Sequence, residues 1–312
     1  MKFKSMVSDW LLKKALEDNV PFTEHQYKHY LEVFGEGEVG FISISDVLCE
    51  AKTGINPSVF KLDNFCRFYL SDETDLTCDV FSPEDFDFDR YKFLKYEDLE
   101  IICNRLEDLQ NEGKIKTIIN PKRPTLLENK KYFTEFYNLG LPVVKTHCFE
   151  TFDKFKEFVN QTNKKVVVKH IFGSEGRGTY LVDKLNVDTM KSKPFSEYIV
   201  QQELEIESEK RFILFEDELL ASRIILDRTR PWELEGKRLH KLSEYKPSKE
   251  ELKRIKEFFS YTGAILGCVD TVQLKDGRDL ILEYNGSATG LGYPEGPYDC
   301  NRIVAQKINN LI

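Results

Sequence analysis

The sequence predicts an α/β protein built from mixed α+β lobes, because short apolar strands alternate with amphipathic helices along most of its 312 residues. Two strand pairs carry most of this prediction. Residues 164–182 are typical of a strand, a glycine-rich loop and a second strand, and residues 263–286 are typical of two apolar strands joined by a tight turn. A chain of this length can bury a substantial core and should form two or three lobes.

Residues 1–118 are expected to form an N-terminal domain that begins with a helix. An amphipathic pattern at 10–16 predicts that helix, and a short alternating strand is expected at 41–45. The acidic, turn-rich stretch 71–90 indicates loops around one or two edge strands. A second helix is expected over 96–112, where leucine and isoleucine recur on one stripe.

Two further lobes are expected at 119–195 and 196–312. A capping box, Ser248 with Glu251, marks the start of one helix in the last lobe. The remaining expected elements are helices at 130–139, 152–160, 248–261 and 301–311 and a strand at 143–149.

The predicted hairpin at 263–286 carries polar residues that suit a metal ion. The Asp-Gly pair at 276–277 is a strong hairpin signal, and Asp270 precedes it by about as far as Glu283 follows it. Glu283 and Asn285 are two residues apart, so they lie on one face of their strand. Hard oxygen ligands of this kind suit Mg²⁺, which usually binds together with a phosphorylated substrate. The alternative is a hairpin whose carboxylates are simply solvated.

The glycine-rich loop is a candidate phosphate-binding segment. Gly173, Gly176 and Gly178 allow tight bends that bring backbone N–H groups against an anion. Lys169 ends an otherwise apolar strand, where an unpaired ammonium group is costly to bury and a phosphate could pair with it. The loop is neither a P-loop nor a Rossmann fingerprint, since no Gly-Lys-Ser/Thr follows and no helix begins there. An ordinary flexible hairpin is the alternative.

Together and in this order, the motifs resemble the ATP-grasp family, in particular the RimK-like and glutathione synthetase-like carboxylate–amine ligases. The resemblance begins at Ile119-Asn120-Pro121, includes Lys130 on an expected helix, and passes through Gly140-Leu-Pro142 to Thr146. The strand that ends at Lys169 and its glycine loop follow. The later matching motifs are the segment 198–204, which is similar to the family's hinge strand, then Arg211, Arg223, and the set Asp270, Glu283 and Asn285.

The resemblance implies an ATP-grasp fold, in which two lobes clamp ATP behind an atypical N-terminal domain. It also implies a role for each matching residue. Lys130 and Lys169 would contact the α- and β-phosphates, and the loop with Gly173, Ser174, Gly176 and Gly178 would cover the γ-phosphate. Gln202, Glu203 and Leu204 would face the adenine, and Glu209 would lie near the ribose. Asp270, Glu283 and Asn285 would hold Mg²⁺ or Mn²⁺, while Arg211 and Arg223 would hold the acyl phosphate and the tetrahedral oxyanion.

The implied reaction is an ATP-dependent ligation of a carboxylate to an amine through an acyl phosphate, with release of ADP and phosphate. An amino acid or peptide is the expected substrate. An ATP-grasp kinase and a nucleotide-binding module without catalysis remain as alternatives. Retention of all three metal-binding oxygens speaks against the binding module.

Composition and charge exclude several other classes. The net charge of −8 argues against nonspecific binding of nucleic acid, which needs a basic face. The longest apolar runs are too short to span a bilayer, and no export signal is expected at the N-terminus. Seven scattered cysteines without a CxxC pair favour reduced thiols in a cytoplasmic protein. A homo-oligomer is left open.

Overall fold

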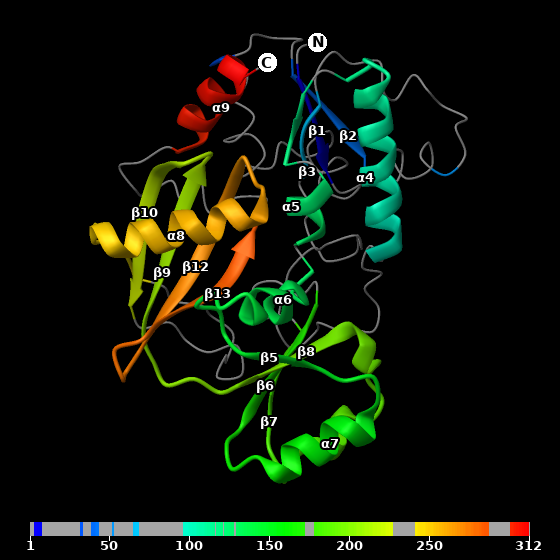
Figure 1. Ribbon diagram of the computed structural model, residues 1–312, viewed down its shortest axis with the longest axis vertical. Coiled ribbons are helices and arrows are strands. Elements are labelled where there is room, and N and C mark those ends of the chain that lie inside the picture. Colours follow the sequence, from blue (N-terminus) through cyan, green and yellow to red (C-terminus); the bar gives the residue numbers. More distant parts are fainter. Residues whose placement is uncertain are drawn as a thin grey trace.

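The computed structural model shows three β-sheets arranged along the long axis of the molecule (Figure 1). It describes residues 3–7, 32–33, 39–43, 52, 65–68, 96–115, 117–120, 122–127, 129–171, 178–226, 241–286 and 300–311. None of the helices within these ranges is long and apolar enough to cross a membrane.

The N-terminal sheet has four parallel strands in the order β2-β1-β3-β4. They are β1 (Phe3–Val7), β2 (Val39–Ser43), β3 (Phe65–Phe68) and β4 (Ile118–Ile119). The expectation that a helix comes first is wrong, because β1 precedes every helix. The five residues of β1 include a lysine and a serine, and their strand conformation depends on pairing with β2 and β3, which no local pattern reveals. The expected helix at 10–16 and the loops at 71–90 lie outside the described residues.

Helix α4 (Tyr96–Asn111) confirms the helix expected at 96–112. Its buried side chains include Ile102, Leu106 and Leu109, three members of the expected apolar stripe. Gly113 follows with φ of +73°, a left-handed conformation that glycine adopts without strain, and the chain leaves the helix there.

The four-stranded sheet at the opposite end of the molecule has the order β5-β8-β6-β7, and its neighbouring strands are antiparallel. The strands are β5 (Thr146–Cys148), β6 (Val166–His170), β7 (Thr179–Val182) and β8 (Tyr198–Gln202). Helix α7 (Phe152–Gln161) packs on this sheet through Phe155 and Val159. Two 3₁₀ turns, η3 (Val187–Met190) and η4 (Phe195–Glu197), connect β7 to β8. The predicted strand–loop–strand hairpin is confirmed as β6 and β7.

The central sheet has five antiparallel strands in the order β11-β10-β9-β12-β13. They are β9 (Ile206–Phe215), β10 (Glu218–Leu226), β11 (Lys241–Glu244), β12 (Leu266–Leu274) and β13 (Asp279–Asn285). Helix α8 (Lys249–Thr262) covers one face, where Phe258 packs near Phe212 and Leu214. Helix α9 (Cys300–Leu311) packs on the other face against Ile213 and Phe215 (Figure 1).

The N-terminus of α8 uses only half of the predicted capping box. The Ser248 hydroxyl accepts a hydrogen bond from the Glu251 backbone N–H at 3.1 Å, as a capping serine should. The Glu251 carboxylate instead accepts hydrogen bonds from Lys210 and Tyr245. The helix ends at Gly263, whose φ is +68°.

The short helices α5 (Lys122–Leu126) and α6 (Tyr132–Asn138) lead from the N-terminal sheet toward β5. Lys130 was expected on a helix, but it lies in the turn before α6. Asn129 explains the later start, because its side-chain oxygen accepts the Lys131 N–H at 3.0 Å and fixes a local turn.

Candidate functional site

Four charged residues form a row across the central sheet. Arg223 on β10 pairs with Arg211 on β9. Arg211 in turn pairs with Asp270 on β12, and Asp270 pairs with Glu283 on β13. Directly paired residues on neighbouring strands project to the same face. The row therefore lies on the face opposite α8, since the alternating neighbours of Arg211 pack toward that helix.

A bulge in β13 completes this row. Thr271 pairs with Ile281, but the next residue of β12, Asp270, pairs with Glu283, so Leu282 is an extra residue in the register. If β13 continued in regular alternation, Glu283 would lie two residues after Ile281, share its face and point toward the α8 side of the sheet. The bulge therefore aims Glu283 at the same side as Asp270, as the hairpin prediction requires.

Asp270 is buried with 4% relative exposure and is held by three polar neighbours. Arg211 donates to both carboxylate oxygens, from Nε at 2.7 Å and from a terminal nitrogen at 2.8 Å. Asn285 lies two residues beyond Glu283, and its amide nitrogen lies 3.4 Å from Asp270. The Cys268 thiol donates to Asp270 at 3.6 Å, and burial, followed by the charge of Asp270, raises the pKa of this thiol well above its usual range.

Glu283 is surrounded by positive charge. Its carboxylate lies 2.9 Å from the Lys130 ammonium group, and the two side chains are 25% and 11% exposed, respectively. Burial opposes ionisation of Glu283, but the charges of Lys130, Lys169 and Arg211 outweigh burial and lower its pKa. Glu283 is therefore an ionised carboxylate at neutral pH, placed among Lys130 from the turn before α6, Lys169 from β6 and Arg211 from β9.

Tyr132 connects the turn that carries Lys130 to the strand that carries Glu283. Its hydroxyl oxygen accepts the Tyr284 backbone N–H at 2.8 Å, on the edge of β13 that faces away from β12. The Lys130 backbone N–H donates to Ile171 at 3.0 Å, just beyond β6. Burial, then the charge of Glu283, raises the pKa of Tyr132 well above its usual range, so the hydroxyl keeps its proton. Tyr132 was not predicted, since it resembles an ordinary core aromatic in sequence.

Asn120 fixes both ends of the β12–β13 hairpin. Its amide nitrogen donates to the carbonyl groups of Leu266 at 2.6 Å and Gly286 at 2.7 Å. Its side-chain oxygen accepts the N–H groups of Ile265 at 2.9 Å and Leu266 at 3.0 Å. The residue has φ of +56°, a conformation that asparagine tolerates better than most residues. Asn120 thus holds the chain immediately after Asn285 in place.

The predicted phosphate loop is described only in part. Gly173, Ser174 and Gly176 lie outside the described residues. Gly178 has φ of +65°, and its carbonyl accepts the His170 N–H at 2.9 Å, which closes the base of the loop. Lys169 lies at this same end of β6, where its charge acts on Glu283.

The predicted hinge segment, 198–204, comprises β8 and the two residues after it. Gln202 is exposed, whereas Glu203 and Leu204 are half-buried. The Glu203 backbone N–H donates to Lys165 at 3.0 Å, so it already has a partner within the protein. Glu209, expected near the ribose, is buried on β9, two residues from Arg211 and on the same face, and pairs with Val272.

The residues that could hold a divalent cation are two carboxylates and one amide. Within the described ranges, no three histidine, cysteine, aspartate or glutamate residues gather as a metal site. Asp270, Glu283 and Asn285 instead offer an all-oxygen set, which fits Mg²⁺ better than a softer metal. Both carboxylates are paired with cations in this structure, and each carboxylate oxygen has a further lone pair for a metal.

Comparison with known proteins identifies the fold. No protein-family model matches the chain, and no curated protein matches it in sequence. The ATP-grasp ligase PsnB complexed with a minimal precursor matches with a TM-score of 0.65 at 12% identity, over 100% of this chain and 99% of that chain. D-cycloserine synthetase DcsG gives 0.63 at 14% identity, over 99% of each chain.

A third similar structure is the macrocyclase MdnC bound with the precursor peptide MdnA from Microcystis aeruginosa MRC. Its TM-score is 0.62 at 13% identity, over 99% of this chain and 100% of that chain. The chain therefore has the ATP-grasp fold, and that prediction is confirmed. At such low identities the likeness shows the fold alone.

Proposed function

We propose that the protein is an ATP- and Mg²⁺-dependent ligase that joins a carboxylate to an amine through an acyl phosphate. The observation that carries this proposal is the row of Arg223, Arg211, Asp270 and Glu283, which Lys130 meets from the neighbouring lobe. The row places two groups suited to oxyanions beside two groups suited to a metal ion. The ATP-grasp fold supports nucleotide binding at this position.

Lys130 and Lys169 would neutralise the phosphates of ATP. The charges of both lysines act on Glu283 in this structure. When ATP binds, its phosphate oxygens would replace Glu283 as the partner of these lysines, and Glu283 would be left to hold the Mg²⁺. Asp270, Glu283 and Asn285 would hold the Mg²⁺, which supplies charge neutralisation for transfer of the γ-phosphoryl group. A PsnB structure contains both Mg and ADP.

Arg211 and Arg223 would act on the carboxylate substrate. A planar guanidinium group donates two parallel hydrogen bonds to a carboxylate or phosphate. Arg211 already makes such a bidentate contact with Asp270, which holds its side chain on the site face. Together the two arginines would stabilise the acyl phosphate and the oxyanion that forms when the amine attacks.

The adenine and ribose would occupy the region after β8. The Glu203 N–H is engaged by Lys165, so the adenine contact at that residue would use its carbonyl oxygen. Leu204 would add the next backbone group. Glu209 would approach the ribose, and the 173–178 loop, with Ser174, would cover the γ-phosphate.

A peptide is the substrate class that we propose. PsnB is complexed with its precursor and MdnC with its precursor peptide, while DcsG is a synthetase of D-cycloserine. These proteins have the same fold over the full chain, which supports a peptide or amino-acid carboxylate here. The protein would act in the cytoplasm, where ATP is available.

Purified protein should release ADP and phosphate from ATP and Mg²⁺ when a peptide with both carboxylate and amine groups is added. Mass spectrometry should then show a product that has lost one water for each bond formed. Release of AMP, or failure to bind nucleotide, would contradict the proposal. A stable phosphoester formed without an amine would instead identify a kinase, and nucleotide binding without turnover would identify a binding module.

A further inference from the structure

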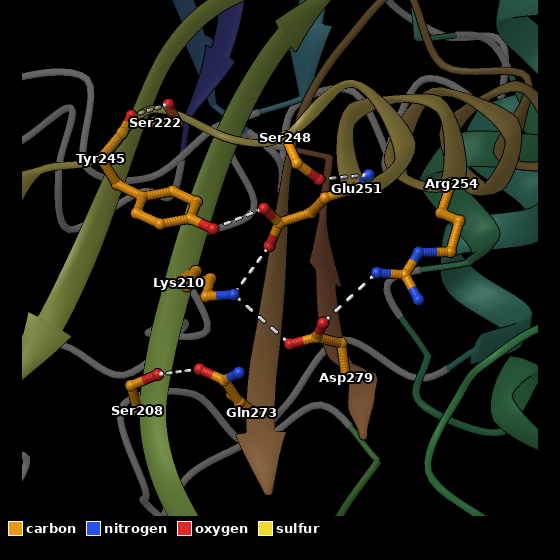
Figure 2. A network of polar contacts seen from close by, with 9 residues as sticks. All are labelled: Ser208, Lys210, Ser222, Tyr245, Ser248, Glu251, Arg254, Gln273 and Asp279. Carbon is orange, nitrogen blue, oxygen red and sulfur yellow. Dashed lines mark hydrogen bonds and ion pairs between the residues drawn. The ribbon is translucent and has the colours of Figure 1, made fainter. Parts of the chain in front are cut away.

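A buried polar network lies on the reverse face of the central sheet, beneath α8 (Figure 2). The Lys210 ammonium group lies 2.8 Å from Glu251 and 3.3 Å from Asp279. The Tyr245 hydroxyl donates to the other oxygen of Glu251 at 2.5 Å. Lys210 and Glu251 are each only 5% exposed, so this central ion pair is shielded from solvent. Arg254 completes it with a contact to Asp279 at 3.3 Å.

The network is fully ionic at its centre. Burial opposes protonation of Lys210, but Glu251, Tyr245 and Asp279 outweigh burial and raise the pKa of Lys210. The ammonium nitrogen also lies 4.9 Å from the centre of the Tyr245 ring. A single charge buried here without its partners would be costly, because the sheet and α8 exclude water.

Two residues on this face each directly precede, in the sequence, one of the two arginines on the opposite face. Lys210 immediately precedes Arg211 on β9, and strand alternation sends the two side chains to opposite faces. Ser222 immediately precedes Arg223 on β10. The Ser222 hydroxyl donates to the Tyr245 carbonyl at 2.5 Å, and the Tyr245 N–H donates to the Ser222 carbonyl at 3.1 Å.

Glu251 consequently connects to both arginine-bearing strands. It binds Lys210, the residue before Arg211, and it binds Tyr245, which is hydrogen-bonded to the residue before Arg223. Asp279, the first residue of β13, extends the same network to that strand; it precedes the bulge, whereas Glu283 follows it. One carboxylate on α8 thus contacts both a residue of β9 and Tyr245, the residue that follows β11 (Figure 2).

We propose that Lys210 and Glu251 are positioning residues, which hold Arg211 and Arg223 in register for the reaction on the other face. Well-packed apolar residues could stabilise this interface equally well, because a buried ion pair contributes little net stability. Unlike apolar packing, the ion pair between Lys210 and Glu251 holds one residue of β9 in a defined direction relative to α8. This inference rests on the proposed ligase function.

The test uses Lys210→Met, Lys210→Met/Glu251→Gln, and a control, Lys156→Met, which removes an exposed ion pair with Asp188 in the other lobe. The single variant Lys210→Met should be destabilised because Glu251 would stay charged and buried without the Lys210 ammonium group. The double variant should regain much of the thermal stability, because glutamine is uncharged and can still accept from Tyr245. Its kcat should nevertheless stay about 10- to 100-fold below wild type, with KM for ATP within about twofold, because small displacements of a positioned group cost this much.

A second measurement does not depend on activity. The Arg211 Nε–H donates to Asp270, so its side-chain NMR resonance reports the position of this arginine. That resonance, assigned by its loss in Arg211→Lys, should shift in the double variant and stay unchanged in Lys156→Met. An unchanged resonance, or a double variant with wild-type kcat and restored stability, would overturn the positioning role. A wild-type protein that releases no ADP would contradict the ligase proposal instead and would leave the NMR test decisive.

Discussion

Replacing Glu283 with glutamine should nearly abolish ADP formation while leaving the protein folded. The change preserves the shape of the side chain but removes the negative charge that faces the Lys130 ammonium group at 2.9 Å. Loss of one preorganised charged group from an active site lowers kcat by about 100- to 1,000-fold. If Glu283 also binds Mg²⁺, a higher Mg²⁺ concentration should restore part of the activity.

The effect on stability should be much smaller. The glutamine oxygen can still accept a hydrogen bond from Lys130, and the pair is partly exposed, with 11% and 25% of the two side chains accessible. Exchange of a charged hydrogen bond for a neutral one should therefore cost about 1 kcal/mol. Lys130, Lys169 and Arg211 would lose a common partner, so Mg²⁺-free ADP should bind at least as tightly as to wild type.

Three assays separate the outcomes: ADP release, thermal unfolding, and calorimetric binding of ADP with and without Mg²⁺. Asp276→Asn is the matched control, because it makes the same carboxylate-to-amide change in the turn of the same hairpin, where the partner is exposed Arg278. The control should behave as wild type. Unchanged ADP formation in Glu283→Gln would remove this residue from the metal site, and loss of the folded state would show that its role is structural.

Three further predictions concern stability. Burial and the charges of Lys130 and Lys193 lower the pKa of His170 from 6.5 to about 4, so the folded protein disfavours the protonated form. The contribution of neutral His170 to the free energy of unfolding should therefore be fully present above pH 6.5 and fall by about 3 kcal/mol as the pH decreases to 4. The difference in free energy of unfolding between wild type and His170→Gln, measured in urea, should show this pH dependence. Tyr132→Phe should cost about 1–3 kcal/mol in the same assay, because a buried backbone N–H loses its acceptor, whereas equal stability would contradict that contact. Asn120→Ala should cost about 4 kcal/mol, because four backbone groups, in three buried hydrogen bonds and one part-buried one, lose their partners, and a loss below about 1 kcal/mol would refute this role.

Local sequence patterns were sufficient to predict the elements that carry the site. The Asp-Gly turn predicted the hairpin, and Gly277 does adopt a left-handed φ of +86° there. Short apolar runs on either side of a glycine-rich loop predicted β6 and β7, and the stripe of leucine and isoleucine predicted α4. Each of these signals depends on residues within a few positions of one another, which a single sequence reveals.

Contacts between distant residues could not be predicted in this way. Asn120 binds backbone groups 145 to 166 residues later, and Tyr132 binds one 152 residues later. Neither residue type nor spacing distinguishes them from an ordinary loop asparagine and an ordinary core tyrosine. The first strand was missed for a related reason, since β1 is defined by its parallel partners β2 and β3.

The bulge at Leu282 shows how a correct prediction can rest on incomplete geometry. Extending the register that pairs Gln273 with Asp279 would pair Asp270 with Leu282 and send Glu283 to the α8 face. The sequence places Asp270 and Glu283 at similar distances from the turn, but a one-residue difference decides the face. Only the irregular pairing brings both carboxylates to the same side.

Three consecutive charged residues in β9 also point to alternating faces of the sheet. Glu209, Lys210 and Arg211 look like an exposed segment, yet Glu209 and Lys210 are buried and Arg211 is mostly buried. Strand alternation gives Arg211 to the site and Lys210 to α8, where its partner Glu251 lies 41 residues later. Each of these two cations is stable because its own face supplies a carboxylate, Asp270 on one side and Glu251 on the other. Lys210 and Arg211 therefore mark two polar sites on opposite faces of the sheet. A substitution of Lys210 should consequently change the position of Arg211 on the other face.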